Sequence, residues 1–169
     1  IGKGTFTGKN TIEVNGKTLS FAKAVVATGG TAAVPNIPGL GQVPYLTNAT
    51  IFNLTELPKR LGVIGAGPIG LELAQAFQRF GSQVTVFSRS DKILPKEDPD
   101  AAKIVESSLR QDGVTFAYNV NYKGVESLGG KPPVTVVLED DGGERTLEFD
   151  ALLVATGRKP AVKGLGLEN

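Results

Sequence analysis

The sequence predicts a three-layer α/β fold that combines a parallel sheet with an antiparallel β-meander, and three observations support this prediction. Residues 61–88 follow the order strand, glycine turn, helix and strand. Residues 122–149 contain three short β-prone runs of alternating character, separated by turns rich in glycine. Two further apolar runs, residues 24–27 and 151–155, each end in an alanine that is followed by threonine and glycine.

The glycine turn GAGPIG, residues 65–70, has the spacing of a dinucleotide-binding loop. In such a loop Gly65 permits the tight turn, Gly67 lets the backbone approach a pyrophosphate, and Gly70 lets the helix pack closely on the strand. The N–H groups and the positive dipole end of the helix then attract the phosphates. In a chain with 22 glycines the pattern alone is weak, and a plain strand and helix joined by a turn is the alternative. Its context indicates a Rossmann-like domain.

Hydrophobic periodicity defines the elements that follow the loop. The sequence predicts a helix after the loop that ends at Gly81. Its apolar residues, three and four apart, form a predicted inward face of Ile69, Leu73, Ala76, Phe77 and Phe80. Residues 84–87 are β-prone and predict a second strand. We therefore expect a strand-helix-strand unit of parallel strands around the glycine loop.

A second helix and a third parallel strand are predicted further along the chain. Asp98 or Asp100 caps this helix, which runs to about residue 111 and ends before Gly113. Its predicted inward face is Ala102, Val105, Ser108 and Leu109. The third parallel strand and the strands of the meander are expected at residues 114–117, 122–128, 134–139 and 146–149.

The first thirty residues are β-rich. Short strands are predicted at residues 4–7, 11–14 and 18–21, with Asn15 and Gly16 as a tight hairpin turn between the last two. A buried strand is predicted at residues 24–27, and residues 31–41 contain two prolines and predict an extended linker.

Composition excludes several classes of function. The chain has 18 basic and 17 acidic residues and no long apolar span, so neither nucleic acid nor a membrane is an expected partner. It has no cysteine and no histidine, so we expect no catalytic residue and no metal site within it. The chain begins with Ile1 and shows no signal peptide, so we expect a piece of a longer, cytoplasmic protein.

The order of the motifs resembles the pyridine nucleotide-disulfide oxidoreductases, or flavoprotein disulfide reductases, and is most similar to their dihydrolipoamide dehydrogenase and mercuric reductase branch. The resemblance rests on VVATGG, a proline crossing, LPKRLGVIGAGPIGLELA, ILP and LLVATGRKP, in that order. It implies that residues 1–47 are the β-rich end of the first FAD-domain segment with its linker. Residues 48–157 would be the NAD(P)-binding domain, and residues 158–169 would return toward the FAD domain.

The resemblance also implies a function for the parent protein. Such a parent, a homodimer, passes a hydride from a nicotinamide nucleotide to FAD and then electrons to a disulfide or a related acceptor. The FAD glycine loop, the CxxxxC redox-active pair and the His-Glu pair of the interface domain are not in this chain. The chain alone is therefore expected to bind the nucleotide without catalysis. Two alternatives stay open: a non-catalytic nicotinamide-nucleotide-binding module, or a non-disulfide flavoprotein reductase.

The end of the second strand decides between NAD and NADP. An acid there binds the ribose 2′-hydroxyl of NAD, whereas a base accommodates the 2′-phosphate of NADP. The resemblance places Ser88 where an acid is usual, and Arg89 and Lys92 follow it. These residues favour NADP over NAD, because a guanidinium suits a phosphate. The alternative is that Arg89 is a solvated loop charge offset by Asp91.

Further contacts with the nucleotide follow from the resemblance. It implies that Glu72, in GPIGLE, orients the nicotinamide, although Glu72 is otherwise an ordinary exposed helix residue. Pro68 and Ile69 complete the glycine loop, and Pro68 stands where some relatives have an aromatic gate, so we expect no such gate. Gly157, after the second ATG strand, is expected to approach the nucleotide or to serve only as a turn glycine.

Overall fold

Two units make up the chain in the computed structural model, which describes residues 1–169. The larger unit is Ala32–Gly157, and the smaller unit joins Ile1–Thr31 with Arg158–Asn169. The assignment of the chain's segments to FAD and nucleotide domains stays a prediction.

A parallel four-stranded sheet forms the centre of the larger unit. Its order is β11-β5-β6-β7, so β5 and β6 have neighbours on both sides. All three pairings are parallel, as the strand-helix-strand pattern predicts. The strands are β5 (Arg60–Ile64), β6 (Gln83–Phe87), β7 (Thr115–Ala117) and β11 (Ala151–Val154).

Two helices and a meander complete this unit. Helix α1 (Pro68–Phe80) joins β5 to β6, and α2 (Pro99–Gln111) lies between β6 and β7 in the chain. The meander has the antiparallel order β10-β9-β8. Its strands are β8 (Asn121–Ser127), β9 (Val134–Asp140) and β10 (Gly143–Phe149). Single 3-10 turns occur at η1 (Leu40–Gln42), η2 (Ile51–Asn53) and η3 (Leu128–Gly130).

The helix ends confirm the predicted signals. Gly81 adopts a left-handed conformation with φ of 110° after the last residue of α1, which a glycine adopts without strain. Of the two candidate caps of α2, Asp98 is the N-cap, because its carboxylate accepts the N–H groups of Asp100 and Ala101 at 2.9 and 3.2 Å. Gly113, with φ of 98°, follows the end of α2.

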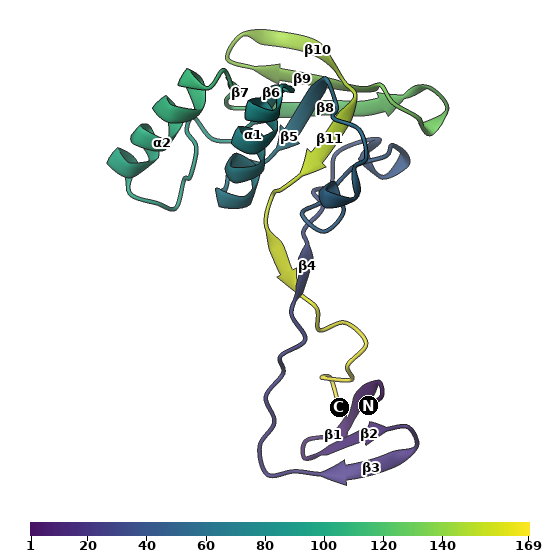
Figure 1. The fold of residues 1–169 in the computed structure, drawn as a ribbon. Helices are drawn as coiled ribbons and strands as arrows, with labels where there is room; N and C mark the ends of the chain where they lie inside the picture. The colour runs from purple at the N-terminus through teal and green to yellow at the C-terminus, as the bar shows by residue number, and fades with distance from the viewer. The chain divides into compact units, whose positions relative to one another are not determined.

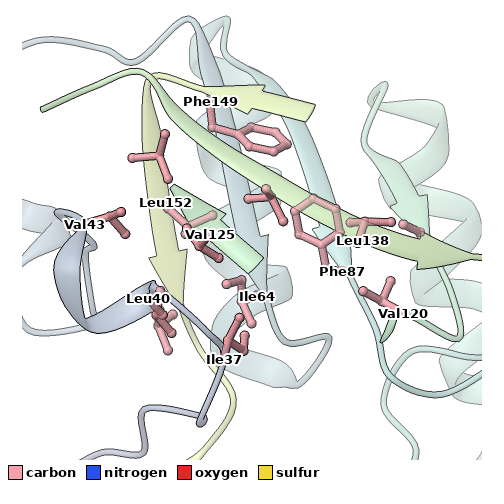
Figure 2. Packing of buried hydrophobic residues seen from close by; sticks show 14 residues of the cluster. Ile37, Leu40, Val43, Ile64, Phe87, Val120, Val125, Leu138, Phe149 and Leu152 are labelled. Atoms are coloured by element: carbon pink, nitrogen blue, oxygen red, sulfur yellow. The ribbon is translucent and has the colours of Figure 1, made fainter. Parts of the chain in front are cut away.

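The parallel sheet separates two hydrophobic cores, and side chains alternate between them with the strand period of two. Leu61 and Val63 of β5 pack with α1 and α2, whereas Ile64 packs toward the meander. On the meander side, Phe87 meets Phe149 edge to face with ring centroids 5.6 Å apart (Figure 2). Helices, parallel sheet and meander thus form the three predicted layers of this unit (Figure 1).

The predicted inward faces of the two helices are partly wrong. Phe80 is 67% exposed, whereas Leu71 and Ala74 are buried. Gly70 and Ala74, two small residues four apart, let this side of α1 approach the sheet most closely, so the helix turns that side inward. In α2 only Ala102 and Leu109 are buried among its apolar residues, while Val105 and Ser108 are exposed. The buried face of this helix is therefore narrow and consists of these two residues, which lie seven positions apart.

The smaller unit contains the predicted hairpin. Its three strands have the antiparallel order β1-β2-β3, with β1 at Gly4–Gly8, β2 at Thr11–Val14 and β3 at Lys17–Ser20. Asn15 and Gly16 have φ of 52° and 74°, the positive values that a type I′ turn requires. Two short strands, β4 (Gly30–Ala32) and β12 (Arg158–Pro160), form a separate pair.

The predicted buried strand at residues 24–27 is wrong. These residues have no regular structure, and Val25 and Val26 are 91% and 44% exposed. An apolar run becomes a buried strand only when neighbouring strands satisfy its backbone groups, and no strand of this chain pairs with it.

Neither of the two α-helices has the length and apolar character that crossing a bilayer requires.

An ion pair ties the start of β5 to the residue between β10 and β11. The Arg60 guanidinium donates to Oδ1 of Asp150 at 2.9 Å, and the Arg60 backbone N–H donates to Oδ2 at 2.8 Å. These hydrogen bonds hold the pKa of Asp150 below its ordinary value. A carboxyl with a lowered pKa stabilises the fold above its unfolded-state pKa, and this contribution is lost as the pH falls through the folded-state pKa.

We expect Asp150→Asn to lower the free energy of unfolding at pH 7 by about 1 kcal/mol, because the side chain is one-third exposed and solvent weakens the pair. The difference from the parent chain should shrink as the pH falls below about 4. Urea unfolding at a series of pH values measures it. A difference of constant size down to about pH 2 would contradict the assignment to Asp150.

Candidate functional site

A pocket of about 490 Å³ lies within the larger unit, at the carboxyl ends of β5, β6 and β11. In open α/β sheets this edge is where ligands bind, because the loops that leave neighbouring strands converge there. Four segments and two single residues line the pocket: residues 64–69, 87–90, 94–97 and 155–157, with Pro35 and Tyr122. It is the place where the predicted glycine loop meets the second ATG segment.

Gly65 has no substitute in its position. Its φ is 115°, and a Cβ added there would lie 2.5 Å from the carbonyl oxygen of Ala155. The turn is held from both sides: the Gly65 N–H donates to the carbonyl of Phe87 at 3.0 Å, and the Ala155 N–H donates to the carbonyl of Ile64 at 2.8 Å. The tight turn predicted from the glycine spacing is therefore present, and it joins three strand ends.

Gly70 acts in packing and does not line the pocket. A Cβ added to Gly70 would lie 2.3 Å from the carbonyl oxygen of Gly65 and 3.3 Å from the Ala155 Cβ. The first turn of α1 thus rests directly on the backbone of the glycine turn. This contact fixes the direction in which the N-terminus of α1 points.

Gly67 differs from both, because nothing lies within 4 Å of a Cβ built on it. It is the N-cap of α1, in an ordinary extended conformation with φ of −87°, and no side chain caps the helix. Pro68 follows at the first helical position, and the first turn contains no acidic residue. The N–H groups of the first helical turn lack intrahelical acceptors, so an anion can bind there.

Ser88 lines the pocket, but its hydroxyl is already used within its own loop. It is 4% exposed, donates to the carbonyl of Lys92 at 2.9 Å and accepts the N–H of Ser90 at 3.2 Å. Ser88 therefore shapes the loop after β6. The position contributes no negative charge to the pocket.

Three charged residues line the pocket: Arg89, Lys96 and Glu97. Arg89 is exposed and makes neither a hydrogen bond nor an ion pair with the protein. Lys92, predicted beside Arg89, is exposed outside the pocket lining, although its carbonyl accepts the Ser88 hydroxyl. The charged part of the lining carries two basic groups and one acidic group.

The pocket brings together seven of the predicted site residues: Gly65, Gly67, Pro68, Ile69, Ser88, Arg89 and Gly157. Gly70, Glu72 and Lys92 lie outside its lining, and Glu72 is exposed on α1. Gly157 has φ of 136°, so glycine is favoured there, and its carbonyl accepts the N–H of Ala33 at 2.9 Å. Contact of any of these residues with a nucleotide stays a prediction.

Sequence reasoning did not identify Tyr122, Leu94 or Lys96 as pocket residues. Leu94 has a left-handed φ of 47°, unusual for leucine, and its N–H donates to the carbonyl of Ala66 in the glycine loop at 2.9 Å. Its place in the ILP motif was the available signal for this loop. Tyr122 gave no signal, because it reads only as an alternating residue of the meander.

Comparison with known proteins agrees with this architecture. A family model described as pyridine nucleotide-disulphide oxidoreductase matches residues 1–169. The chain is 40% identical over 166 residues to a mercuric reductase of Bacillus cereus, covering 98% of the chain and 26% of that protein. It is 34% identical over 174 residues to a dihydrolipoyl dehydrogenase of Acholeplasma laidlawii, covering 99% of the chain and 50% of that protein.

Solved structures give the same picture. The HOCl-induced flavoprotein disulfide reductase RclA of Escherichia coli superposes with a TM-score of 0.84 at 34% identity, covering 99% of the chain and 38% of that protein. LpdA of Mycobacterium tuberculosis superposes with a TM-score of 0.80 at 30% identity, with the same coverage of 99% and 38%. The chain therefore spans half or less of these four relatives. Since the family model matches the whole chain, the chain belongs to the pyridine nucleotide-disulphide oxidoreductase family.

Proposed function

We propose that the unit Ala32–Gly157 binds a nicotinamide nucleotide, with the pyrophosphate at the N-terminus of α1, and that it prefers NADPH to NADH. One observation carries this proposal. The pocket at the carboxyl ends of the parallel strands contains a glycine-loop helix N-terminus that has no side-chain cap and no acidic residue in its first turn. Such a site supplies N–H donors and a positive dipole end to a phosphate.

The residues around this N-terminus fit a pyrophosphate. The open space above Gly67 admits a ligand close to the backbone, whereas Gly65 and Gly70 are enclosed by protein. The volume of about 490 Å³ falls within the ordinary range for small-molecule sites, about 300–1,000 Å³. The different surroundings of the three glycines support this proposal: Gly65 lies in the tight turn, Gly70 packs on that turn, and Gly67 leaves space for a ligand.

The preference for NADPH rests on the charges after β6. A carboxylate at the position of Ser88 would repel a 2′-phosphate, but the Ser88 hydroxyl carries no charge and stays within its own loop. Arg89 lines the same part of the pocket and has no partner that would compete with a ligand. A guanidinium can bind a phosphate through two parallel hydrogen bonds to two phosphate oxygens. NADH has a hydroxyl at the 2′ position instead of a phosphate, so it cannot form this pair of bonds.

In the longer protein, the bound nucleotide would supply a hydride to FAD, and the electrons would pass on to a disulfide or a metal-ion acceptor. The relatives named mercuric reductase, dihydrolipoyl dehydrogenase and flavoprotein disulfide reductase support this part of the proposal. This chain contains neither cysteine nor histidine, so its own contribution is to bind and orient the nucleotide. The FAD and interface domains, and a second subunit, would be its partners.

Isothermal titration of the chain with NADPH and NADH tests the proposal. We expect NADPH to bind about tenfold more tightly, and Arg89→Ala to remove the difference, because the guanidinium is the group that contacts the extra phosphate. Lys103→Ala is the matched control. It removes one positive charge from an exposed position of α2 outside the pocket and should leave the ratio of the two affinities unchanged.

Each part of the proposal has its own contrary result. Equal affinities, or a preference for NADH, would contradict the NADP assignment. Binding of neither nucleotide, in a chain whose circular dichroism shows the expected helix and strand content, would contradict the site itself.

A further inference from the structure

Tyr122 lines the pocket from an unexpected direction. It belongs to β8 of the meander, whereas nearly all other lining residues come from the loops at the carboxyl edge of the parallel sheet. Its hydroxyl oxygen is buried and has no hydrogen-bond partner in the protein. A buried hydroxyl without a partner is unfavourable relative to a hydrogen-bonded one, so its presence requires an explanation.

The ring of Tyr122 lies beside the end of β6, where the loop of Ser88 and Arg89 begins. The Tyr122 ring packs against Phe87, the last residue of β6, with ring centroids 6.2 Å apart and the ring planes at 71°. Ser88 and Arg89 follow Phe87 directly, and Arg89 is the charge that acts on the Tyr122 phenol. In a Rossmann-like domain the end of this second strand receives the adenosine ribose.

The chemistry of the phenol makes it a donor. Burial raises the pKa of Tyr122 above its ordinary value, and the nearby Arg89 opposes this effect only in part. The hydroxyl therefore keeps its proton throughout the physiological pH range. A protonated phenol and a guanidinium that line the same pocket are both hydrogen-bond donors, and a phosphate group offers acceptor oxygens to both.

We propose that the Tyr122 hydroxyl and the Arg89 guanidinium jointly bind the 2′-phosphate of NADPH, which makes Tyr122 a second residue that determines nucleotide specificity. This inference rests on the proposed function. Because the hydroxyl is buried, the phosphate reaches it only after neighbouring atoms move. Arg89 is exposed and makes no hydrogen bond or ion pair with the protein that would hold it in place. The meander would thus take part in reading the nucleotide as well as covering the sheet.

The variant Tyr122→Phe tests the inference, because phenylalanine keeps the ring that packs on Phe87 and removes only the hydroxyl. The ligands are NADPH, NADH, and 2′,5′-ADP, which carries the 2′-phosphate without the nicotinamide half. We expect NADPH and 2′,5′-ADP to bind about tenfold more weakly to the variant, and NADH to change less than about twofold. The thermal unfolding midpoint should not fall, because the variant loses an unpartnered buried hydroxyl.

Ser127→Ala is the matched control. Ser127 lies on the same strand β8 and carries the other buried, unpartnered hydroxyl of the chain, but it does not line the pocket. Its removal should leave the affinity for all three ligands unchanged. This control separates loss of a ligand contact from any general effect of removing a buried hydroxyl from the meander.

The outcomes separate this inference from the proposed function. Unchanged affinity of Tyr122→Phe for NADPH and 2′,5′-ADP would overturn the role of Tyr122 while leaving nucleotide binding intact. Equal weakening of NADPH and NADH would also overturn it, because the hydroxyl would then contact a part that both nucleotides share. If the parent chain binds none of the three ligands, the proposed function and this inference fail together.

Discussion

Gly70→Ala is expected to lower the free energy of unfolding by about 2–3 kcal/mol, because the added methyl group would overlap packed backbone. The added Cβ would lie 2.3 Å from the carbonyl oxygen of Gly65. Because both groups belong to packed backbone, no side-chain rotation relieves the contact, and α1 must move away from the sheet. The higher helix propensity of alanine, about 1 kcal/mol, offsets only part of this cost.

Guanidinium chloride unfolding followed by circular dichroism measures the change. Gly41→Ala is the matched control, since Gly41 lies in the same unit, has nothing within 4 Å of an added Cβ, and is exposed. Its unfolding free energy should change by less than about 0.5 kcal/mol. Similar values for the two variants would mean that the contact between α1 and the glycine turn does not limit stability.

The fold of the larger unit could be predicted because its local signals agree with one another. Gly67 and Gly81 mark the two ends of α1, Asp98 caps α2, and the apolar runs at β5 and β6 mark buried strands. Each signal depends on residues close in the sequence, so it can be recognised without knowing the tertiary structure.

What could not be predicted depends on partners far away in the sequence. The face that α1 buries is chosen by the close approach at Gly70, which periodicity alone does not reveal, because several stripes of α1 are apolar. The run at residues 24–27 has the composition of a buried strand and yet is irregular, because no strand of this chain pairs with it. A strand needs a neighbouring strand to pair with, and the composition of a segment does not show whether one is present.

The candidate site shows the same division. The glycine loop and Arg89 follow closely after the ends of two strands that the sequence predicts. Their position at the pocket could therefore be predicted from their spacing in the sequence. The sequence predicts Ser88 as a site residue because it carries no charge where an acid is usual. Its hydrogen bonds with Lys92 and Ser90 depend on the path of the loop, which the sequence does not show. Tyr122 reaches the pocket only because the meander packs on the same face of the sheet as Phe87.

Gly67→Asp is expected to weaken NADPH binding at least about 100-fold while raising the unfolding free energy by about 0.5–1 kcal/mol. Gly67 already has the extended conformation of an N-cap, and the space around it is open, so an aspartate fits without strain. Its carboxylate would accept the free N–H groups of the first turn of α1 and place a negative charge at the positive end of the helix. Both effects stabilise the helix, and both compete with a pyrophosphate for the same donors.

Gly67→Asn separates these two causes, because asparagine caps a helix about as well as aspartate but carries no charge. The asparagine variant should gain less stability than the aspartate variant, because it lacks the favourable charge at the helix N-terminus, and it should lose less affinity. The remaining difference in affinity measures the repulsion between the carboxylate and the phosphates. Thermal unfolding and titration with NADPH on the same samples give both quantities. An aspartate variant that gains stability and still binds NADPH as the parent chain does would show that the pyrophosphate does not bind at the N-terminus of α1, and the proposed function would then be wrong.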